Sequence, residues 1–117
     1  MNIETLREFC LSLKGVEEKT PFGPDTLVFY VKDKMFCLMN IDEFDFINVK
    51  CDPEEAILLR EQYNEVTPGY HMNKTHWNSV ATSGKVSDKL MMEWIKKSYD
   101  LVVSKLPKKS KQELSGE

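Results

Sequence analysis

The sequence lacks the features that identify secreted, disulfide-linked or membrane-spanning proteins. Its three cysteines, Cys10, Cys37 and Cys51, form no CxxC pair and are odd in number, which indicates reduced thiols and argues against a disulfide framework. No apolar stretch approaches the roughly 20 residues of a membrane span. Residues 1–10 contain two acids and no basic-then-apolar pattern, so a secretory signal is not expected. We therefore predict a cytoplasmic protein without a membrane partner.

Motifs of the common catalytic and metal sites are also missing. The sequence contains no P-loop, GxGxxG or GxSxG motif, no HExxH pair and no EF-hand loop. His71 and His76 would lie on opposite faces of a regular strand, so a shared metal ion would need a bend and a third ligand such as Cys51 or Asp52. Cys51 precedes a helix start, but the acids beside it would raise the pKa of its thiol. We predict no catalytic residue, no metal site and no cofactor.

Charge is distributed unevenly along the chain. The net charge of −3 argues against a generic nucleic-acid binder, because phosphate binding needs clustered Lys and Arg. Residues 40–65 hold eight acids and two bases, whereas residues 66–87 hold Lys74, Lys85 and no acid. A segment with lysines, amides and aromatic rings but no carboxylate could face phosphates and bases. The alternative is that a buried or edge strand simply contains few acids.

The hydrophobic pattern predicts one α+β domain, which also fits a chain of 117 residues with 41% hydrophobic content. The expected elements, in chain order, are a helix over 3–13, strands over 27–32, 35–41 and 44–50, a short helix from 53, extended structure over 70–82 and a helix over 88–106. Short links between the strands favour an antiparallel meander. We predict a two-layer sandwich with the order α-β-β-β-α-β-β-α, in which an antiparallel sheet of about five strands carries the N- and C-terminal helices on one face. The domain spans residues 1–107. Residues 15–26 are expected to be a loop, and residues 108–117 a disordered polar tail.

The sequence PGYHMNKTHWNSV at residues 68–80, hereafter the signature segment, resembles the signature of the MmcQ/YjbR-like proteins, which are small bacterial chains. Other short motifs fit the same pattern: Pro21-Phe22-Gly23, Lys34-Met35-Phe36, Val49-Lys50, Asp52-Pro53-Glu54 and Ser98-Tyr99. The resemblance covers about residues 1–107, and Asn73–Trp77 is its most specific part. It implies a fold similar to the CyaY-like (frataxin-like) and secretion-chaperone-like sandwiches. It also implies DNA binding through a double-wing arrangement, and it names no catalytic residues.

Three functional hypotheses remain open. The first is a DNA-binding protein in which lysines contact phosphates while amide, imidazole and indole groups form hydrogen bonds or stack. The residues assigned to this interface are Lys34, Lys50, His71, Asn73, Lys74, His76, Trp77 and Lys85. The second is a module that binds a protein or a small ligand, with residues 70–77 as one wall of a pocket. The third is structural: the signature segment holds a bent strand through internal hydrogen bonds. We expect a monomer in each case.

Overall fold

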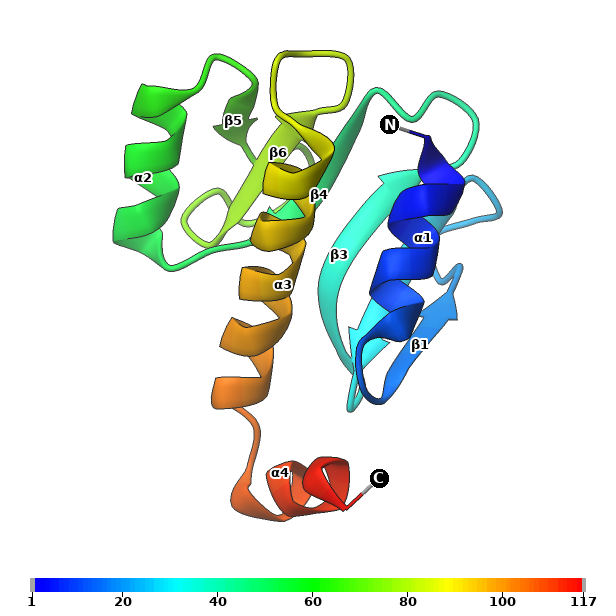
Figure 1. Ribbon diagram of the computed structural model, residues 1–117. Coiled ribbons are helices and arrows are strands. Elements are labelled where there is room, and N and C mark those ends of the chain that lie inside the picture. Colours follow the sequence, from blue (N-terminus) through cyan, green and yellow to red (C-terminus); the bar gives the residue numbers. More distant parts are fainter. Residues whose placement is uncertain (1, 117) are drawn as a thin grey trace.

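An open antiparallel sheet organises the fold. A computed structural model describes residues 2–116, and its six strands lie in the spatial order β1-β2-β3-β4-β6-β5 (Figure 1). The elements are α1 (Ile3–Ser12), β1 (Val16–Lys19), β2 (Thr26–Val31), β3 (Lys34–Asn40), β4 (Phe46–Lys50), α2 (Pro53–Gln62), β5 (Val66–Pro68), β6 (Trp77–Ala81), α3 (Asp88–Ser104) and α4 (Lys108–Ser115). The predicted α+β sandwich is confirmed, with six strands rather than about five.

Local sequence signals set where the elements begin. Asn2, Asp52 and Ser87 each accept a hydrogen bond from a backbone N–H in the first turn of α1, α2 and α3, which replaces a partner that the helix itself cannot supply. Lys32 and Asp33 form a two-residue turn between β2 and β3, both with positive φ (47° and 64°), as a tight hairpin requires.

None of the helices formed by residues 2–116 combines the length and the hydrophobicity that a membrane span requires.

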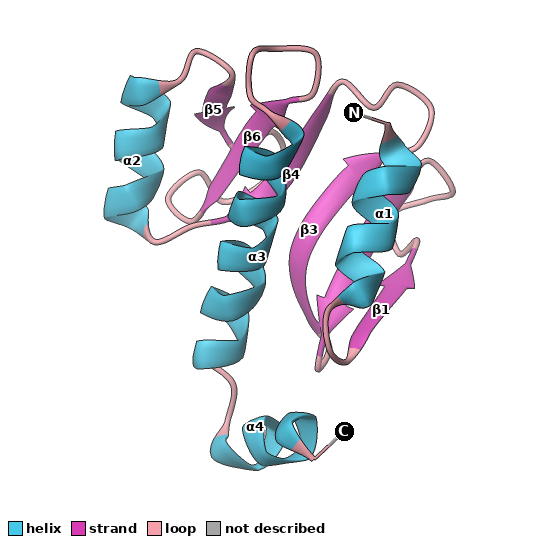
Figure 2. Cartoon of the chain, in the orientation of Figure 1, coloured by secondary structure: helices cyan, strands magenta, loops and turns pink. Residues whose placement is uncertain are grey.

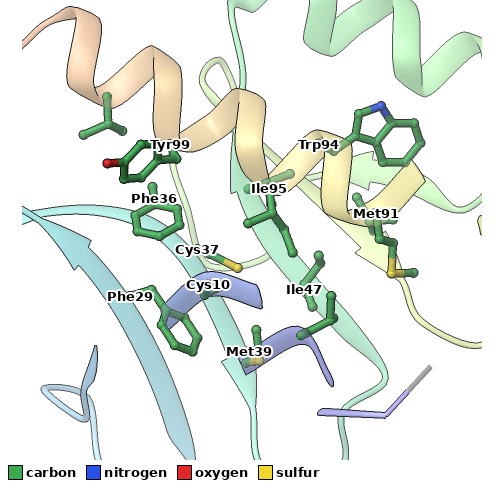
Figure 3. Packing of buried hydrophobic residues seen from close by; sticks show 14 of the residues in the cluster. Cys10, Phe29, Phe36, Cys37, Met39, Ile47, Met91, Trp94, Ile95 and Tyr99 are labelled. Carbon is green, nitrogen blue, oxygen red and sulfur yellow. The ribbon is translucent and has the colours of Figure 1, made fainter. Parts of the chain in front are cut away.

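The main hydrophobic core lies between one face of the sheet and the helices (Figure 2). Phe36 of β3 packs against Phe29 and Tyr99, with ring centroids 6.5 and 5.4 Å away (Figure 3). Ile47 and Val49 of β4 are both buried in this core, because alternate residues of a strand share one face. The core fixes which face of each strand remains available for other contacts.

The opposite face of the sheet is covered by no helix within residues 2–116 (Figure 2). We call it the open face. A smaller apolar cluster of Val28, Leu38 and Trp77 lies there, separate from the main core. Trp77 is only 7% exposed because the loop residue Met72 also packs on this cluster. The open face is therefore partly hydrophobic, and the loop before β6 folds over it.

Two segments that the sequence suggested were irregular are regular elements. Val16–Lys19, within the expected loop, forms the edge strand β1 and pairs with β2. Residues 108–115, expected to be a disordered tail, instead form α4. Leu114 is the reason, because its side chain is 6% exposed and belongs to the main core. The Lys14 ammonium also donates a hydrogen bond to the Ser115 carbonyl (3.1 Å). The C-terminal residues thereby become part of the folded surface.

Candidate functional site

Internal hydrogen bonds hold the signature segment in place. Arg60 of α2 donates from Nε to Asn78 Oδ1 (2.7 Å) and from Nη2 to the carbonyls of Lys74 and Trp77 (3.2 Å to Trp77). Asn78 is fully buried, and its own amide group donates to a carbonyl of α2 (3.3 Å). One guanidinium group thus connects α2 to both the loop before β6 and the strand itself. Sequence reasoning missed this role of Arg60.

Four of the residues predicted to contact DNA make internal contacts. Asn73 Oδ1 accepts a hydrogen bond from the backbone N–H two residues later (2.9 Å), and the Lys74 ammonium donates to the Gly69 carbonyl (3.0 Å). The His76 carbonyl accepts a hydrogen bond from the backbone N–H that follows β4 (2.7 Å). Trp77 is buried in the open-face cluster. These contacts match the structural hypothesis for the signature segment.

The four predicted lysines do not form one surface. Lys34 begins β3, and the antiparallel neighbour β4 ends at Lys50, which pairs with Trp77 at the start of β6. Lys34, Lys50 and Lys74 therefore lie toward one end of the sheet. Lys85 follows β6 and lies at the opposite end, in the yellow loop of Figure 1. The geometry separates Lys85 from the other three.

A larger group of lysines surrounds the place where α4 docks. Hydrogen bonding of Lys14 to Ser115 and the approach of Lys32 to Glu113 (3.9 Å) bring α4 to the end of α1 and to the β2–β3 turn (Figure 1). We call this surface the basic end. Its lysines are Lys14, Lys32, Lys34, Lys105, Lys108, Lys109 and Lys111. All except Lys32 are exposed. The segments that carry them, residues 14, 32–34 and 105–113, contain two acids, so their net charge is +5.

A groove of about 340 Å³ hollows the open face over β2, β3 and β4. Residues 70–72 form one wall, whereas the second hypothesis placed the whole segment 70–77 there, and Phe22, Leu38 and Phe46 contribute other sides. The Tyr70 ring meets Phe46 edge-on at 5.6 Å. We call this hollow the open-face groove. It contains His71 but none of the other residues assigned to the DNA interface.

Two hydrogen bonds fix the backbone of the groove wall. The Tyr70 N–H donates to Ser79 Oγ (2.9 Å), and the Tyr70 carbonyl accepts from Asn48 Nδ2 (3.3 Å). The Ser79 hydroxyl donates to Asn48 Oδ1 (2.5 Å), so the two side chains form a pair below the loop. His71 follows with a positive φ of 60°, a conformation uncommon for a residue with a side chain, and its ring lies 4.0 Å from that of Tyr70.

Cys51 is poorly suited to be a nucleophile. Burial and, to a smaller extent, the neighbouring Glu55 carboxylate together raise the pKa of its thiol to about 11. The sequence predicted the effect of the acids but not that of burial, which is the larger one. The thiolate, which is the reactive form, is therefore scarce at neutral pH. Within residues 2–116 no group of three or more His, Cys, Asp and Glu side chains is arranged to hold a metal ion.

The sheet, its helices and these surfaces define a small α+β protein with one covered and one open sheet face. A family model described as YjbR matches residues 11–101, and the chain belongs to the YjbR family. The Escherichia coli O157:H7 protein YbdF is 39% identical over 110 residues, covering 93% of this chain and 90% of YbdF. YjbR of E. coli K12 is 29% identical over 113 residues, covering 96% of each chain.

Solved structures support the same assignment. The crystal structure of Deinococcus radiodurans protein DR2400, a DUF419 domain, aligns with a TM-score of 0.91 and 36% identity, covering 97% of this chain and 88% of that one. A crystal structure of a Pseudomonas syringae protein aligns with a TM-score of 0.73 and 27% identity, covering 86% of this chain and 98% of that one. The family resemblance predicted from the signature segment is confirmed.

Proposed function

We propose that this protein binds double-stranded DNA through the phosphate backbone at the basic end and performs no catalysis. The observation that carries the proposal is the gathering of seven lysines from the end of α1, the β2–β3 turn and the α3–α4 region at one end of the molecule, on chain segments with a net charge of +5. Clustered lysines release the counterions condensed on DNA, which is the main source of sequence-independent affinity. The family resemblance independently implies DNA binding.

The acids at the far end of the sheet do not oppose this surface at physiological salt. The Debye length is about 8 Å at 0.15 M ionic strength. β3 runs from Lys34 at the basic end to Asn40, and its six steps of about 3.4 Å place the two about 20 Å apart. The acids that follow Asn40 in residues 42–45 are thus more than two Debye lengths from the basic end. Their repulsion of a bound phosphate is largely screened.

The chemistry of the basic end favours binding without sequence selectivity. Its cations are all lysines, whose ammonium groups act as point charges on flexible stems. The chain has only two arginines, and both are engaged elsewhere: Arg7 binds Glu18 (2.7 Å) and Arg60 holds the signature segment. Contacts of this kind position a protein on the duplex but do not read bases. We expect a dissociation constant in the range of about 1–100 μM near physiological salt.

Two double variants with equal change in net charge test the proposal. Lys108→Ala/Lys109→Ala removes two charges from the basic end, and Lys85→Ala/Lys89→Ala removes two from the opposite end of the sheet. Alanine preserves the helices. Fluorescence anisotropy of a labelled duplex at several salt concentrations should show that only the first variant loses affinity. Its slope of log K against log salt should fall in magnitude by about 2, since each phosphate contact contributes about 0.9.

Two results would refute the proposal. Equal weakening by both double variants would show that net charge, not the basic end, controls binding. Absence of binding by the unmodified protein at 0.15 M salt would show that the lysine cluster has another purpose.

A further inference from the structure

The open-face groove has the size of a small-molecule site. Its volume of about 340 Å³ lies at the lower end of the range of roughly 300–1,000 Å³ typical of ligand pockets. Phe22 and Tyr70, which line it, are 64% and 57% exposed. Aromatic rings of this size gain substantially from burial, so a ligand that covered both would be stabilised by them. A cavity of this volume fits one ring-sized group rather than a length of peptide.

The wall of the groove is organised before any ligand binds. Asn48 and Ser79 hold the Tyr70 backbone to the sheet, and Lys74 ties the following loop to Gly69. A ligand would not have to order this loop, and the entropic cost of binding would be correspondingly small. The internal hydrogen bonds of the signature segment thus also hold the wall of the open-face groove in place.

The two main chain segments that line the groove carry charge of one sign. Among the described residues that line it, none is Lys or Arg. The two chain segments that supply most of the lining, residues 20–31 and 39–49, contain four acids and no base. These acids are Asp25, Asp42, Glu43 and Asp45.

Each acid is close in the chain to a lining residue. Asp25 directly precedes Thr26, and Asp45 directly precedes Phe46. The Asn40 side chain, also in the lining, accepts hydrogen bonds from both N–H groups of residues 42 and 43 (2.9 Å each). Lys85 is the base of the β6–α3 loop at this end, and its backbone N–H is bonded to the Glu65 carboxylate (3.0 Å). Two further bases are engaged in other contacts: the Lys74 ammonium donates to the Gly69 carbonyl (3.0 Å), and the Lys19 ammonium lies over the Tyr30 ring (5.1 Å to its centroid). The four acids therefore outnumber the bases around the groove, which favours a cation over an anion.

We propose that the open-face groove binds a free small organic cation, in which an ammonium group is attached to an aromatic or apolar body. The body would cover Phe22 and Tyr70, and the ammonium group would lie against an aromatic face near the acids. Aromatic faces attract cations through their quadrupole, and this attraction adds to that of the carboxylates. The site is separate from the basic end, so it does not depend on the proposed binding of DNA.

Three probes of similar size and different charge test the inference. The 2-phenylethylammonium ion, 2-phenylethanol and phenylacetate are titrated into ¹⁵N-labelled protein at pH 8 and low salt, and amide shifts are followed by NMR. We expect the cation to shift the amides of residues 46–48 and 70–72. It should bind about threefold more tightly than the alcohol and about tenfold more tightly than the carboxylate.

Variants separate the contribution of the acids from that of the rings. Asp25→Asn/Asp45→Asn should remove most of the preference for the cation, whereas Asp33→Asn, at the other end of β2, should leave it unchanged. Tyr70→Leu should weaken all three probes, and its amide spectrum reports whether the fold is intact. Equal affinity for the three probes would overturn the proposed cation selectivity while leaving the groove as a binding site. No shift at the groove with any probe would overturn the site itself.

Discussion

Replacement of Arg60 by alanine should destabilise the protein far more than replacement of its other arginine. Arg60 donates to Asn78 Oδ1 and to the carbonyls of Lys74 and Trp77. The Trp77 carbonyl also accepts the Gly69 N–H (2.8 Å), and Lys74 is exposed, so these two acceptors would keep a partner or gain water. Asn78 is fully buried and would lose the donor to its Oδ1. The cost therefore lies mainly at Asn78.

The expected magnitude follows from that one acceptor. A hydrogen bond to a charged group contributes about 1.5–3 kcal/mol, and a buried acceptor left without a donor costs about 1–3 kcal/mol. We expect Arg60→Ala to lower the free energy of unfolding by about 3 kcal/mol. At about 2.1 cal/mol/K per residue, the unfolding entropy of 117 residues is about 0.25 kcal/mol/K, so Tm should fall by about 12 °C.

Arg7→Ala is the matched control, since it also removes one arginine and one positive charge. Arg7 binds Glu18 on the surface, where their side chains are 47% and 28% exposed, and such a pair contributes at most about 1 kcal/mol. Urea unfolding followed by tryptophan fluorescence measures both variants. If Arg60→Ala costs no more than Arg7→Ala, the guanidinium does not hold the signature segment and the structural role assigned to it is wrong.

Three further outcomes are expected. Leu114→Ala should lower the free energy of unfolding by about 2 kcal/mol and weaken DNA binding without removing a charge, because α4 loses its buried anchor; urea unfolding and anisotropy check this. Cys51, with a pKa of about 11, should be about 0.1% thiolate at pH 8, so a thiol reagent should label the native protein at least 100-fold more slowly than the unfolded protein. The hydrogen bond from Arg7 lowers the pKa of Glu18, so its stabilisation is present above the ordinary carboxyl pKa and is lost as pH falls through the lowered value. The unmodified protein and Glu18→Gln should converge in stability between pH 7 and pH 2 in urea unfolding.

The elements that could be predicted from sequence are those with a strong local pattern. The stripe of Met91, Trp94 and Ile95 predicted α3, and all three are buried in the core. β1 and α4 could not be predicted in this way. Val16–Lys19 contains one apolar residue and is a strand because β2 offers it an edge. α4 has one buried residue, Leu114, and a single anchor produces no periodicity.

The candidate surfaces were less predictable because they depend on contacts between distant residues. The signature segment was recognisable from sequence. The residue type alone, however, does not show whether a lysine or asparagine faces solvent or, like Lys74 and Asn73, forms a hydrogen bond to the backbone of its own loop. The basic end needs α1 and α4 to meet, and only their packing brings Lys14 next to Ser115. The alternation of the strand does put Phe46 and Asn48 on one face, and the open-face groove lies on it.

The separation of charge has a consequence for the salt dependence of DNA binding. The whole chain carries −3 and the segments of the basic end carry +5, so the remaining residues carry −8. At 0.15 M salt the acids of residues 42–45, at the far end of the sheet, are screened from the basic end, because about 20 Å of sheet exceeds the Debye length of about 8 Å. At 0.01 M the Debye length is about 30 Å, and repulsion by the remaining residues then reaches the bound duplex. A plot of log K against log salt should therefore be linear near physiological salt and flatten toward 0.01 M. A plot that stayed linear throughout would mean that the acidic part of the molecule lies too far from the DNA to be felt, and that the duplex contacts the basic end alone.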